Sequence, residues 1–387
     1  MDIGVITREV SPLTRNGGIG TAMRFLCEAL VTAAAHRVTV YCTGRPSLRM
    51  GAFARQMDRL GISFRPIIAP LGLLLHDQRR RSRAVEKALA GARHDCLLFH
   101  EFMADGWSYL QQRGPGGPAC GMVTHGSALW VDEGNGVVAA DGPRAQVYAM
   151  ERQCCELADF LVSPSHYLLD WMRGRGWKLP AESRVIPNFT SPYAEDAGTS
   201  PPRRGRDSAP PRELVFFGRL EERKGLRVFC EALLLLPPEL LAGRRVTFLG
   251  REGGYTTEQV RAWLAPLSEA GLTLAFHTDF DAPQARAYLC GEGRLAVMPS
   301  LRENSPCVVS ECLESGIPFL ASASGGGPEL ARSEDADCFV EPDAAKLASR
   351  LGHILQSGPP GPALPRHAPQ DLLAAWQELL GRGAPRV

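Results

Sequence analysis

The chain has 387 residues, and its 43 Lys and Arg side chains nearly balance 42 Asp and Glu, for a formal net charge of +1. This balance excludes the strongly basic field typical of nucleic-acid-binding proteins, so we predict no nucleic-acid partner. The 11 cysteines are scattered without a C-x-x-C pair, which argues against structural zinc and a disulfide framework. The chain opens with the strand-like DIGVIT, and its apolar runs fall short of the roughly 18–20 residues of a membrane span. We therefore expect a cytoplasmic protein without a secretory signal.

The first elements form a βαβ pattern with a glycine-rich turn. A strand is predicted at 2–7, a helix at 21–35 and a second strand at 36–42, with the turn RNGGIG between the first two. This turn could belong to an NAD-dependent dehydrogenase. However, Met23 stands where a third glycine is required, and the second strand ends in Thr43-Gly44 without an acidic residue for a ribose. The pattern disfavours that alternative.

Strands are next predicted at 62–68, 95–101 and 119–125, with helices between them. The last strand ends in His125-Gly126, at the end of a strand, where α/β domains place active residues. A purely structural histidine is the alternative. His100-Glu101 end the preceding strand, and for them we predict no specific role beyond contact with an acceptor.

A change of composition separates two α/β halves. Residues 191–212 are rich in Pro, Ser and charged side chains and contain almost no large apolar ones, which predicts a linker. We place one domain at 1–190 and a second at 213–365. A final amphipathic helix is predicted within 366–387.

The second half opens with a strand, the turn 218–225 and a helix. The turn contains Arg219 and Lys224, two cations five residues apart beside glycines, a pattern suited to a diphosphate. An exposed basic turn would look the same in isolation. Further strands are predicted at 244–249 and at 273–280.

Residues 295–330 are the most informative stretch. The pattern predicts a strand at 295–299, a helix with Ser305 as its N-cap and Pro306 as its first residue, and a helix stop at Gly316. A second strand, 317–322, leads into a loop whose backbone can approach a ligand closely, Gly325, Gly326 and Gly327. Together these elements form a parallel βαβ unit.

Glu303 and Glu311 lie on either side of the predicted helix start, with Glu311 beside the apolar arc of the helix. A surface glutamate would show the same pattern. Carboxylates accept hydrogen bonds from sugar and ribose hydroxyls, while a helix N-terminus and free backbone N–H groups bind a diphosphate. This combination suits a nucleotide sugar.

These residues carry a resemblance to a known family. E-x7-E, with the flanking P-S, G-I-P and G-G-x-P-E-L elements, resembles the donor-site signature of the retaining, nucleotide-sugar-dependent glycosyltransferases of the GT-B type (group 1, family 4). F-x-G-R-L-x-x-x-K-G at 216–225 is a second shared element. V-I-P-N at 185–188 is similar to a third, although Phe189 stands where a glycine usually follows.

The resemblance implies an α/β fold with GT-B architecture, in which two Rossmann-like domains face each other across a cleft and the C-terminal helix packs back on the first. It implies transfer of a sugar to a hydroxyl of a glycan, lipid-linked glycan or natural product, with retention and without a metal or cofactor. We favour UDP-sugars over GDP- or ADP-sugars. The implied catalytic residues are His125, Glu303, Arg219 and Lys224. The implied donor-binding residues are Gly17, Gly18, Arg219, Lys224, Glu303, Asn304, Ser305, Glu311, Gly325, Gly326 and Gly327.

One further alternative function and two further sequence patterns stand beside this interpretation. A non-catalytic nucleotide-binding protein would bind a nucleotide sugar without turning it over. Asp335-Ala336-Asp337 spells the D-x-D of metal-dependent transferases, but it lies away from the predicted donor site, and we interpret it as coincidence. Residues 71–83 set apolar side chains beside four arginines, which allows weak contact with anionic lipid at the inner membrane face. A solvated helix start explains the same segment.

Overall fold

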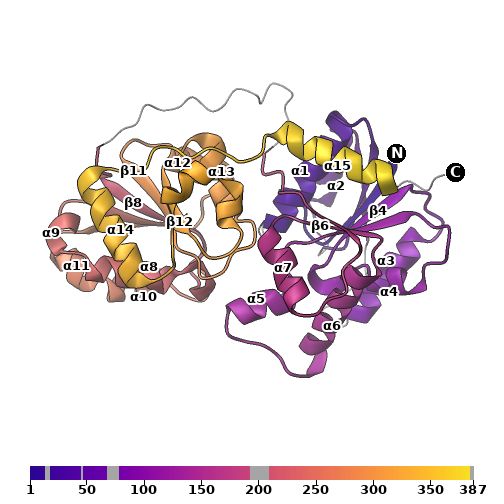
Figure 1. Ribbon diagram of the computed structural model, residues 1–387, viewed down its shortest axis with the longest axis horizontal. Helices are drawn as coiled ribbons and strands as arrows, with labels where there is room; N and C mark the ends of the chain where they lie inside the picture. Colours follow the sequence, from indigo (N-terminus) through magenta and orange to yellow (C-terminus); the bar gives the residue numbers. More distant parts are fainter. Residues whose placement is uncertain (14–17, 45–46, 68–77, 192–208, 384–387) are drawn as a thin grey trace. The chain divides into compact units, whose positions relative to one another are not determined.

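The computed structural model describes residues 1–387 except 14–17, 45–46, 68–77, 192–208 and 384–387. The chain divides into two compact units (Figure 1). Unit 1 comprises Met1–Gly198 and His367–Val387, and unit 2 comprises Thr199–Arg366. The division falls within the polar segment 191–212.

Unit 1 is built on a parallel sheet in the order β3-β2-β1-β4-β5-β6-β7. Ile3 of β1 pairs with Val38 of β2 on one side and with Cys96 of β4 on the other. The chain therefore adds β2 and β3 on one side of β1 and then crosses to the opposite side with β4. The strands are β1 Asp2–Thr7, β2 Arg37–Cys42, β3 Ile62–Pro66, β4 Cys96–His100, β5 Ala119–Val123, β6 Phe160–Ser163 and β7 Glu182–Val185.

Helices cover both faces of this sheet because successive strand residues point to opposite sides. Val5 packs in the core with α1, α2 and α15, whereas Ile6 packs in the core with α3, α4, α6 and α7. The helices are α1 Gly18–Thr32, α2 Met50–Arg59, α3 Gln78–Leu89, η1 Phe102–Ala104, α4 Trp107–Gln112, α5 Ala128–Gly134, α6 Gly142–Leu157, α7 His166–Gly174 and α15 Pro369–Gly383.

Unit 2 contains a second parallel sheet, in the order β10-β9-β8-β11-β12-β13. Ala296 of β11 pairs with Val215 of β8 on one side and Phe319 of β12 on the other, which confirms the predicted parallel βαβ unit. The strands are β8 Glu213–Phe217, β9 Arg245–Leu249, β10 Thr273–His277, β11 Arg294–Met298, β12 Phe319–Ser322 and β13 Phe339–Val340.

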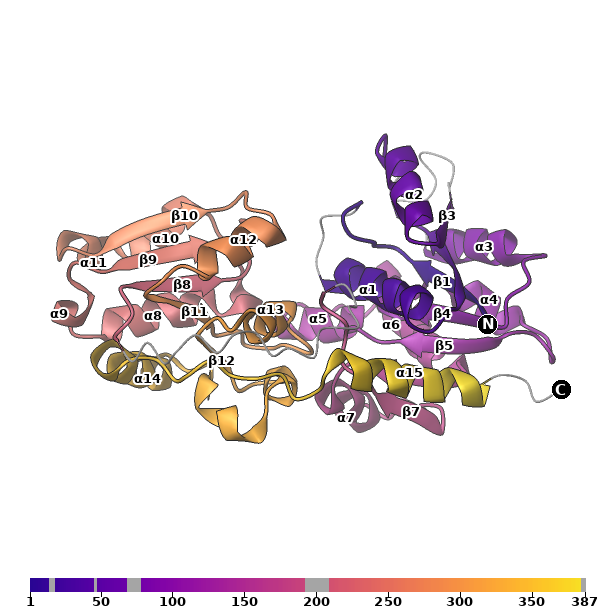
Figure 2. The same cartoon turned by 90° about the horizontal axis from the view of Figure 1, so that it is seen from above.

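In unit 2, helices also lie on both faces of the sheet (Figure 2), and each face carries its own core. Phe216 packs in the core with α8, α10, α11 and α14, and its neighbour Val215 packs with α12 and α13. The helices are η2 Glu222–Lys224, α8 Leu226–Leu235, α9 Pro238–Leu241, α10 Thr257–Trp263, α11 Ala265–Glu269, α12 Ala282–Leu289, α13 Cys307–Ser315, η3 Gly327–Leu330, η4 Ser333–Cys338 and α14 Ala344–Ser357.

Two predicted helix starts are wrong. The first helix, predicted at 21–35, is α1 at Gly18–Thr32, and the start of α13 is wrong by one residue. Pro306, with ψ 112°, is extended and forms the N-cap of α13, so the first helical residue is Cys307 and Ser305 does not cap the helix. An extended Pro306 satisfies the fixed φ of proline without entering the helix. The predicted stop is confirmed, because Gly316 adopts φ 62° at the C-cap.

The basic segment 71–83 lies only partly within the described residues. In α3, the exposed Arg79 lies over the Trp107 ring at 5.8 Å, but Arg81 is half-buried and donates from its guanidinium to the Thr43 carbonyl at 3.1 Å. Arg81 therefore does not belong to a solvent-facing basic face, and the remaining membrane hypothesis stays a prediction. Among the described residues, no helix is long and apolar enough to span a membrane.

Candidate donor and acceptor site

The order of the strands creates a switch point in each sheet. In unit 2 the chain moves outward from β8 to β10 and then returns to β11 on the other side of β8. Loops leaving the carboxyl ends of two such strands diverge, and ligands of α/β proteins bind at this point. The turn 218–225 follows β8, and residues 299–306 follow β11. Both sequence motifs of this half therefore lie together at the carboxyl ends of the neighbouring strands β8 and β11.

Glu303 is the centre of this region. Its side chain is only 12% exposed and forms an ion pair with the Lys224 ammonium, while Arg223 Nη1 lies 3.4 Å from Glu303 Oε1. Burial would raise the pKa of Glu303, but the charges of Lys224 and Arg223 outweigh it and hold the pKa below its ordinary value. The carboxylate is therefore ionised at neutral pH.

Arg223 was missed by the sequence analysis, which placed the diphosphate on Arg219 and Lys224. Its guanidinium is nearly buried and also bonds to Glu221 Oε1 at 3.0 Å and the Arg302 carbonyl at 3.1 Å. Arg219 is 56% exposed and reaches Glu221 at 3.2 Å. Two arginines lie in the run RLEERK, residues 219–224, and charge alone does not tell the buried one from the solvated one. The 3₁₀ turn η2 decides which of the two points inward.

Two glycines allow the loops to approach each other. Gly225 has φ 71°, and a Cβ there would lie 1.9 Å from the Pro299 carbonyl oxygen. Gly325 has φ 94°, and a Cβ there would lie 1.9 Å from the Glu303 carbonyl oxygen. Gly326 N donates to the same carbonyl at 3.1 Å. The glycine loop after β12 is thus attached directly to the backbone of Glu303.

The second glutamate of the E-x7-E pattern lies on α13. Glu311 is half-buried, and burial raises its pKa to about 7, with Arg286 acting in the opposite direction. Burial raises the pKa of the Cys307 thiol, and the charged groups that act on this thiol include Glu311, Lys224 and Glu303. The structure therefore brings Glu303 and Glu311 to the N-terminal half of α13.

The remaining predicted donor residues of unit 2 lie beside this cluster. Asn304 is buried, and Ser305 is half-buried immediately before α13. Gly327 is buried as the first residue of η3. The Asp335 carboxylate of the D-x-D accepts a hydrogen bond from Leu364 N at 2.9 Å, which gives this residue a structural role.

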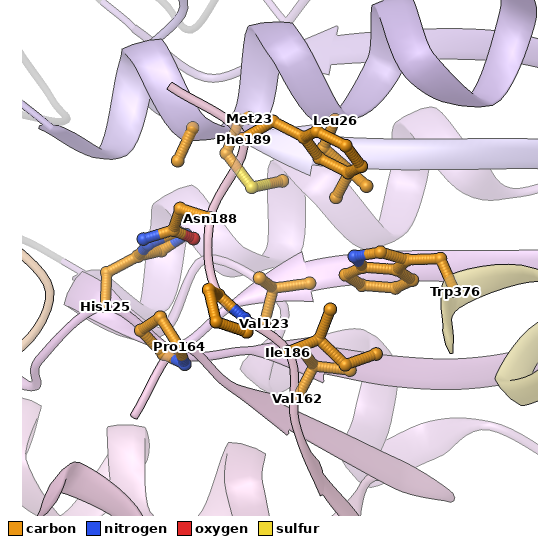
Figure 3. A pocket seen from close by; sticks show the side chains of 12 residues that line it. Met23, Leu26, Val123, His125, Val162, Pro164, Ile186, Asn188, Phe189 and Trp376 are labelled. Atoms are coloured by element: carbon orange, nitrogen blue, oxygen red, sulfur yellow. The ribbon is translucent and has the colours of Figure 1, made fainter. Parts of the chain in front are cut away.

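In unit 1, His125 lies just after β5. The loop reverses through Gly126, with φ 116°, and Ser127 caps α5 by accepting from Trp130 N at 3.2 Å. His125 also borders a small pocket, in which Figure 3 shows His125 and Asn188 on one side and Trp376 of α15 on the other. Its other lining residues are mostly apolar, among them Met23, Leu26, Val123, Val162 and Ile186.

His125 is neutral at physiological pH. Burial, with a smaller contribution from His100, lowers the pKa of His125 to about 3. His100 is 2% exposed, and its Nε2 accepts from Arg8 N at 3.1 Å, so the neutral ring carries its proton on Nδ1. A neutral His125 can exchange hydrogen bonds with a sugar hydroxyl without a charge. Of the two predicted glycines of this unit, Gly18 begins α1, and Gly17 lies outside the described residues.

Two family models match the chain on either side of the polar segment. The model described as Glycosyltransferase Family 4 matches residues 16–192, and the model described as Glycosyl transferases group 1 matches residues 211–357. The chain is a group 1, family 4 glycosyltransferase. The dehydrogenase alternative is therefore wrong: a glycine-rich turn after the first strand is common to both classes, and it does not by itself indicate NAD.

Solved structures confirm the GT-B architecture of the glycosyltransferase. Sucrose-phosphate synthase from Thermosynechococcus elongatus matches with a TM-score of 0.64 and 18% identity, over 99% of this chain and 94% of that one. Anabaena HepE in complex with UDP and glucose matches at 0.60 and 14%, over 99% and 95%. The catalytic domain of starch synthase IV from Arabidopsis thaliana, bound to ADP and acarbose, matches at 0.62 and 13%, over 99% of both chains. No curated protein matches the glycosyltransferase in sequence.

Proposed function

We propose that this glycosyltransferase moves a sugar from a nucleoside diphosphate sugar to an acceptor hydroxyl, with retention of anomeric configuration and without a metal ion. The observation that carries the proposal is the buried, ionised Glu303, which is held by Lys224 and Arg223 at the switch point of unit 2. Burying charged groups costs desolvation free energy even when they are paired, and such buried charge clusters are concentrated at functional sites. Its setting suits a site that reads hydroxyl groups next to a diphosphate.

Each group has a role in the proposed complex. Lys224 and Arg219 bind the diphosphate, and the backbone N–H groups at the start of α13 and of Gly325–Gly327 add donors around it. Glu303 accepts hydrogen bonds from hydroxyls of the transferred sugar, and Glu311 accepts them from the ribose. Neutral His125 contacts the sugar from unit 1.

The reaction needs stabilisation of a leaving group more than a protein nucleophile. The bond between the sugar C1 and the diphosphate oxygen breaks, and a bond between C1 and the acceptor oxygen forms on the same face. The acceptor proton passes to an oxygen of the departing phosphate. Lys224 and Arg219 stabilise the negative charge that develops on the diphosphate, which is the kind of electrostatic term that dominates many enzymes.

The donor base is proposed to be uracil. HepE was solved with UDP and glucose, although starch synthase IV was solved with ADP. A thermal-shift screen of UDP, GDP, ADP and their sugars tests this choice, because a ligand that binds only the folded state raises the unfolding midpoint. The largest shift is expected with UDP or a UDP-sugar, and a larger shift with GDP or ADP would overturn the base assignment.

Stereochemistry and metal dependence require turnover. Incubation of the best donor with a panel of glycans, lipid-linked glycans and other hydroxyl-bearing acceptors, followed by proton NMR of the product, should show the anomeric configuration of the donor. The rate should be the same with and without EDTA. An inverted product or loss of activity in EDTA would overturn those parts of the proposal. Binding without turnover across the panel would favour a non-catalytic nucleotide-binding protein.

A further inference from the structure

A second buried carboxylate lies behind His125, outside the roles assigned above. Glu101 follows β4 directly and its residue is fully buried. Its Oε1 atom accepts hydrogen bonds from His125 N at 2.7 Å and from Gly126 N at 2.5 Å. These two amides lie in the turn that carries the His125 ring. One carboxylate oxygen thus holds the backbone of the turn on both sides of the His125 Cα.

Glu151 of α6 strengthens the same arrangement from the other side. It is fully buried, and its two oxygens accept from Ala128 N at 2.8 Å and from Met103 N at 2.6 Å. Glu151 therefore ties the loop after β5 to the loop after β4. In that second loop Met103 and Ala104 have positive φ values of 66° and 50°, which non-glycine residues adopt only when the surroundings impose them.

Three polar atoms in this region are buried without a hydrogen-bond partner among the described residues: His100 Nδ1, Glu101 Oε2 and His125 Nε2. Buried polar atoms of this kind are uncommon in folded proteins. The rings of His100 and His125 are 6.3 Å apart. Other ionisable groups surround these residues. Arg8 and Asp105 act electrostatically on His100, and Arg144 acts on Glu151. The thiols of Cys154 and Cys155 interact with Glu101 and Glu151.

We propose that Glu101 is a positioning residue for sugar transfer: by accepting from His125 N and Gly126 N, it orients the His125 ring toward the transferred sugar. The proposal rests on the proposed function, in which His125 contacts that sugar. The two hydrogen bonds, and not a proton transfer by Glu101, are what the transfer step requires. For the transfer step, the length of the Glu101 side chain is therefore more important than its charge.

Two variants of Glu101 separate the effect of side-chain length from the effect of charge. Glu101→Gln keeps a side-chain oxygen at the same distance and loses the charge, so kcat should stay within about 5-fold of the wild type. Glu101→Asp keeps the charge but is shorter by about 1.5 Å, so it should lose both contacts and lower kcat at least 10-fold. Donor KM should change little in either. The opposite ranking, with Asp active and Gln inactive, would overturn the positioning role.

Glu213→Asp is the matched control for shortening a buried carboxylate. Glu213 starts β8, at the opposite end of its strand from the donor site, and bonds to Thr247, Tyr288 and Arg294. Its kcat should be unchanged. A double-mutant cycle gives the second arm: in a His125→Ala background, Glu101→Asp should cause no further loss of kcat. Losses that multiply would show that Glu101 does not act through His125.

A measurement without turnover keeps this proposal separate from the proposed function. The His125 ring resonances, assigned by their absence in His125→Asn, should show no protonation above about pH 5 in the wild type. In Glu101→Asp they should shift and titrate closer to pH 6.5, the value for a solvated histidine. Unchanged resonances would overturn the proposal even if the wild type is inactive. If Glu101→Asp shifts the His125 resonances as expected but the wild type turns over no donor, only the proposed function would be overturned.

Discussion

A buried carboxylate is stable in its ionised form only when cations and hydrogen-bond donors replace the water that it loses. Glu303 meets this requirement through Lys224 and Arg223, and Arg223 is held in turn by Glu221. Removing one cation leaves the carboxylate partly uncompensated. The charges of this cluster therefore depend on one another. Replacing one of its charged residues should impair the protein more than replacing one partner of an exposed ion pair.

Replacing the ammonium group of the cluster should impair transfer. Lys224→Ala removes one partner of Glu303 and one cation proposed for the diphosphate, so we expect a loss of about 10²-fold or more in kcat/KM. Steady-state kinetics with the best donor measure it. Lys346→Ala, which removes the exposed partner of Glu341, should leave kcat/KM unchanged. Wild-type kcat/KM for Lys224→Ala would contradict its assignment to the diphosphate.

The other glutamate of the pattern makes donor binding dependent on pH. Burial raises the pKa of Glu311 to about 7, so the group gains a proton as pH falls from 8 to 6 and loses an acceptor for ribose hydroxyls. We expect the nucleotide affinity, measured by calorimetry, to fall about 10-fold over this range. Glu311→Gln should bind more weakly at pH 8 and show a smaller pH dependence. Equal pH profiles for both proteins would argue against Glu311 as the titrating group.

At the scale of single elements, loops that leave neighbouring strands are locked by backbone contacts which exclude a side chain. Gly225 and Gly325 combine a positive φ with a carbonyl oxygen 1.9 Å from the position of a Cβ. No side-chain movement can relieve either contact. The two motifs therefore need glycine at these positions because the loops around the donor site approach each other too closely for a side chain.

Substitution of one of these glycines should therefore destabilise unit 2. Gly325→Ala imposes left-handed strain of about 1–3 kcal/mol and displaces the loop attached to Glu303. We expect a lower unfolding midpoint by calorimetry and a weaker nucleotide affinity. Gly254→Ala is the control, because a Cβ there has no heavy atom within 4 Å and needs no positive φ. A Gly325→Ala protein with wild-type stability and affinity would refute the packing argument.

At the scale of the whole molecule, the chain ends in the unit where it began. Helix α15 belongs to unit 1 (Figure 1), where Leu373, Trp376, Leu379 and Leu380 lie in the core with α1 and β1. Trp376 also borders the pocket next to His125. The last helix therefore stabilises the fold that positions the proposed sugar-contacting histidine, although it is distant from it in sequence.

Loss of this packing should affect unit 1 selectively. Trp376 is 3% exposed, so Trp376→Ala should destabilise unit 1 by about 3–5 kcal/mol, the usual cost of truncating a buried aromatic side chain. Hydrogen exchange followed by mass spectrometry should show faster exchange in 1–191 and little change in 209–366. The exposed neighbour Gln377→Ala should behave as the wild type. Equal destabilisation of both units would contradict the assignment of α15.

The local patterns of the sequence were sufficient to predict most of the strands, the helix stop at Gly316 and the family, because glycine turns, buried strands and E-x7-E depend on neighbours along the chain. The short strands β7 and β13 were not predicted. The cap of α13 was misplaced by one residue, since Ser305 and Pro306 both fit a helix start and only their backbone angles distinguish them.

The sequence by itself thus determined the architecture and the edge of the sheet where Glu303 and Lys224 lie. Only the tertiary structure decided which of two arginines pairs with Glu303, and that Glu101 holds the turn of His125 across 24 residues of sequence. The physical reason is that burial and hydrogen bonding depend on which side chains meet after the strands have paired, and identical charges in a sequence can end in water or in the core.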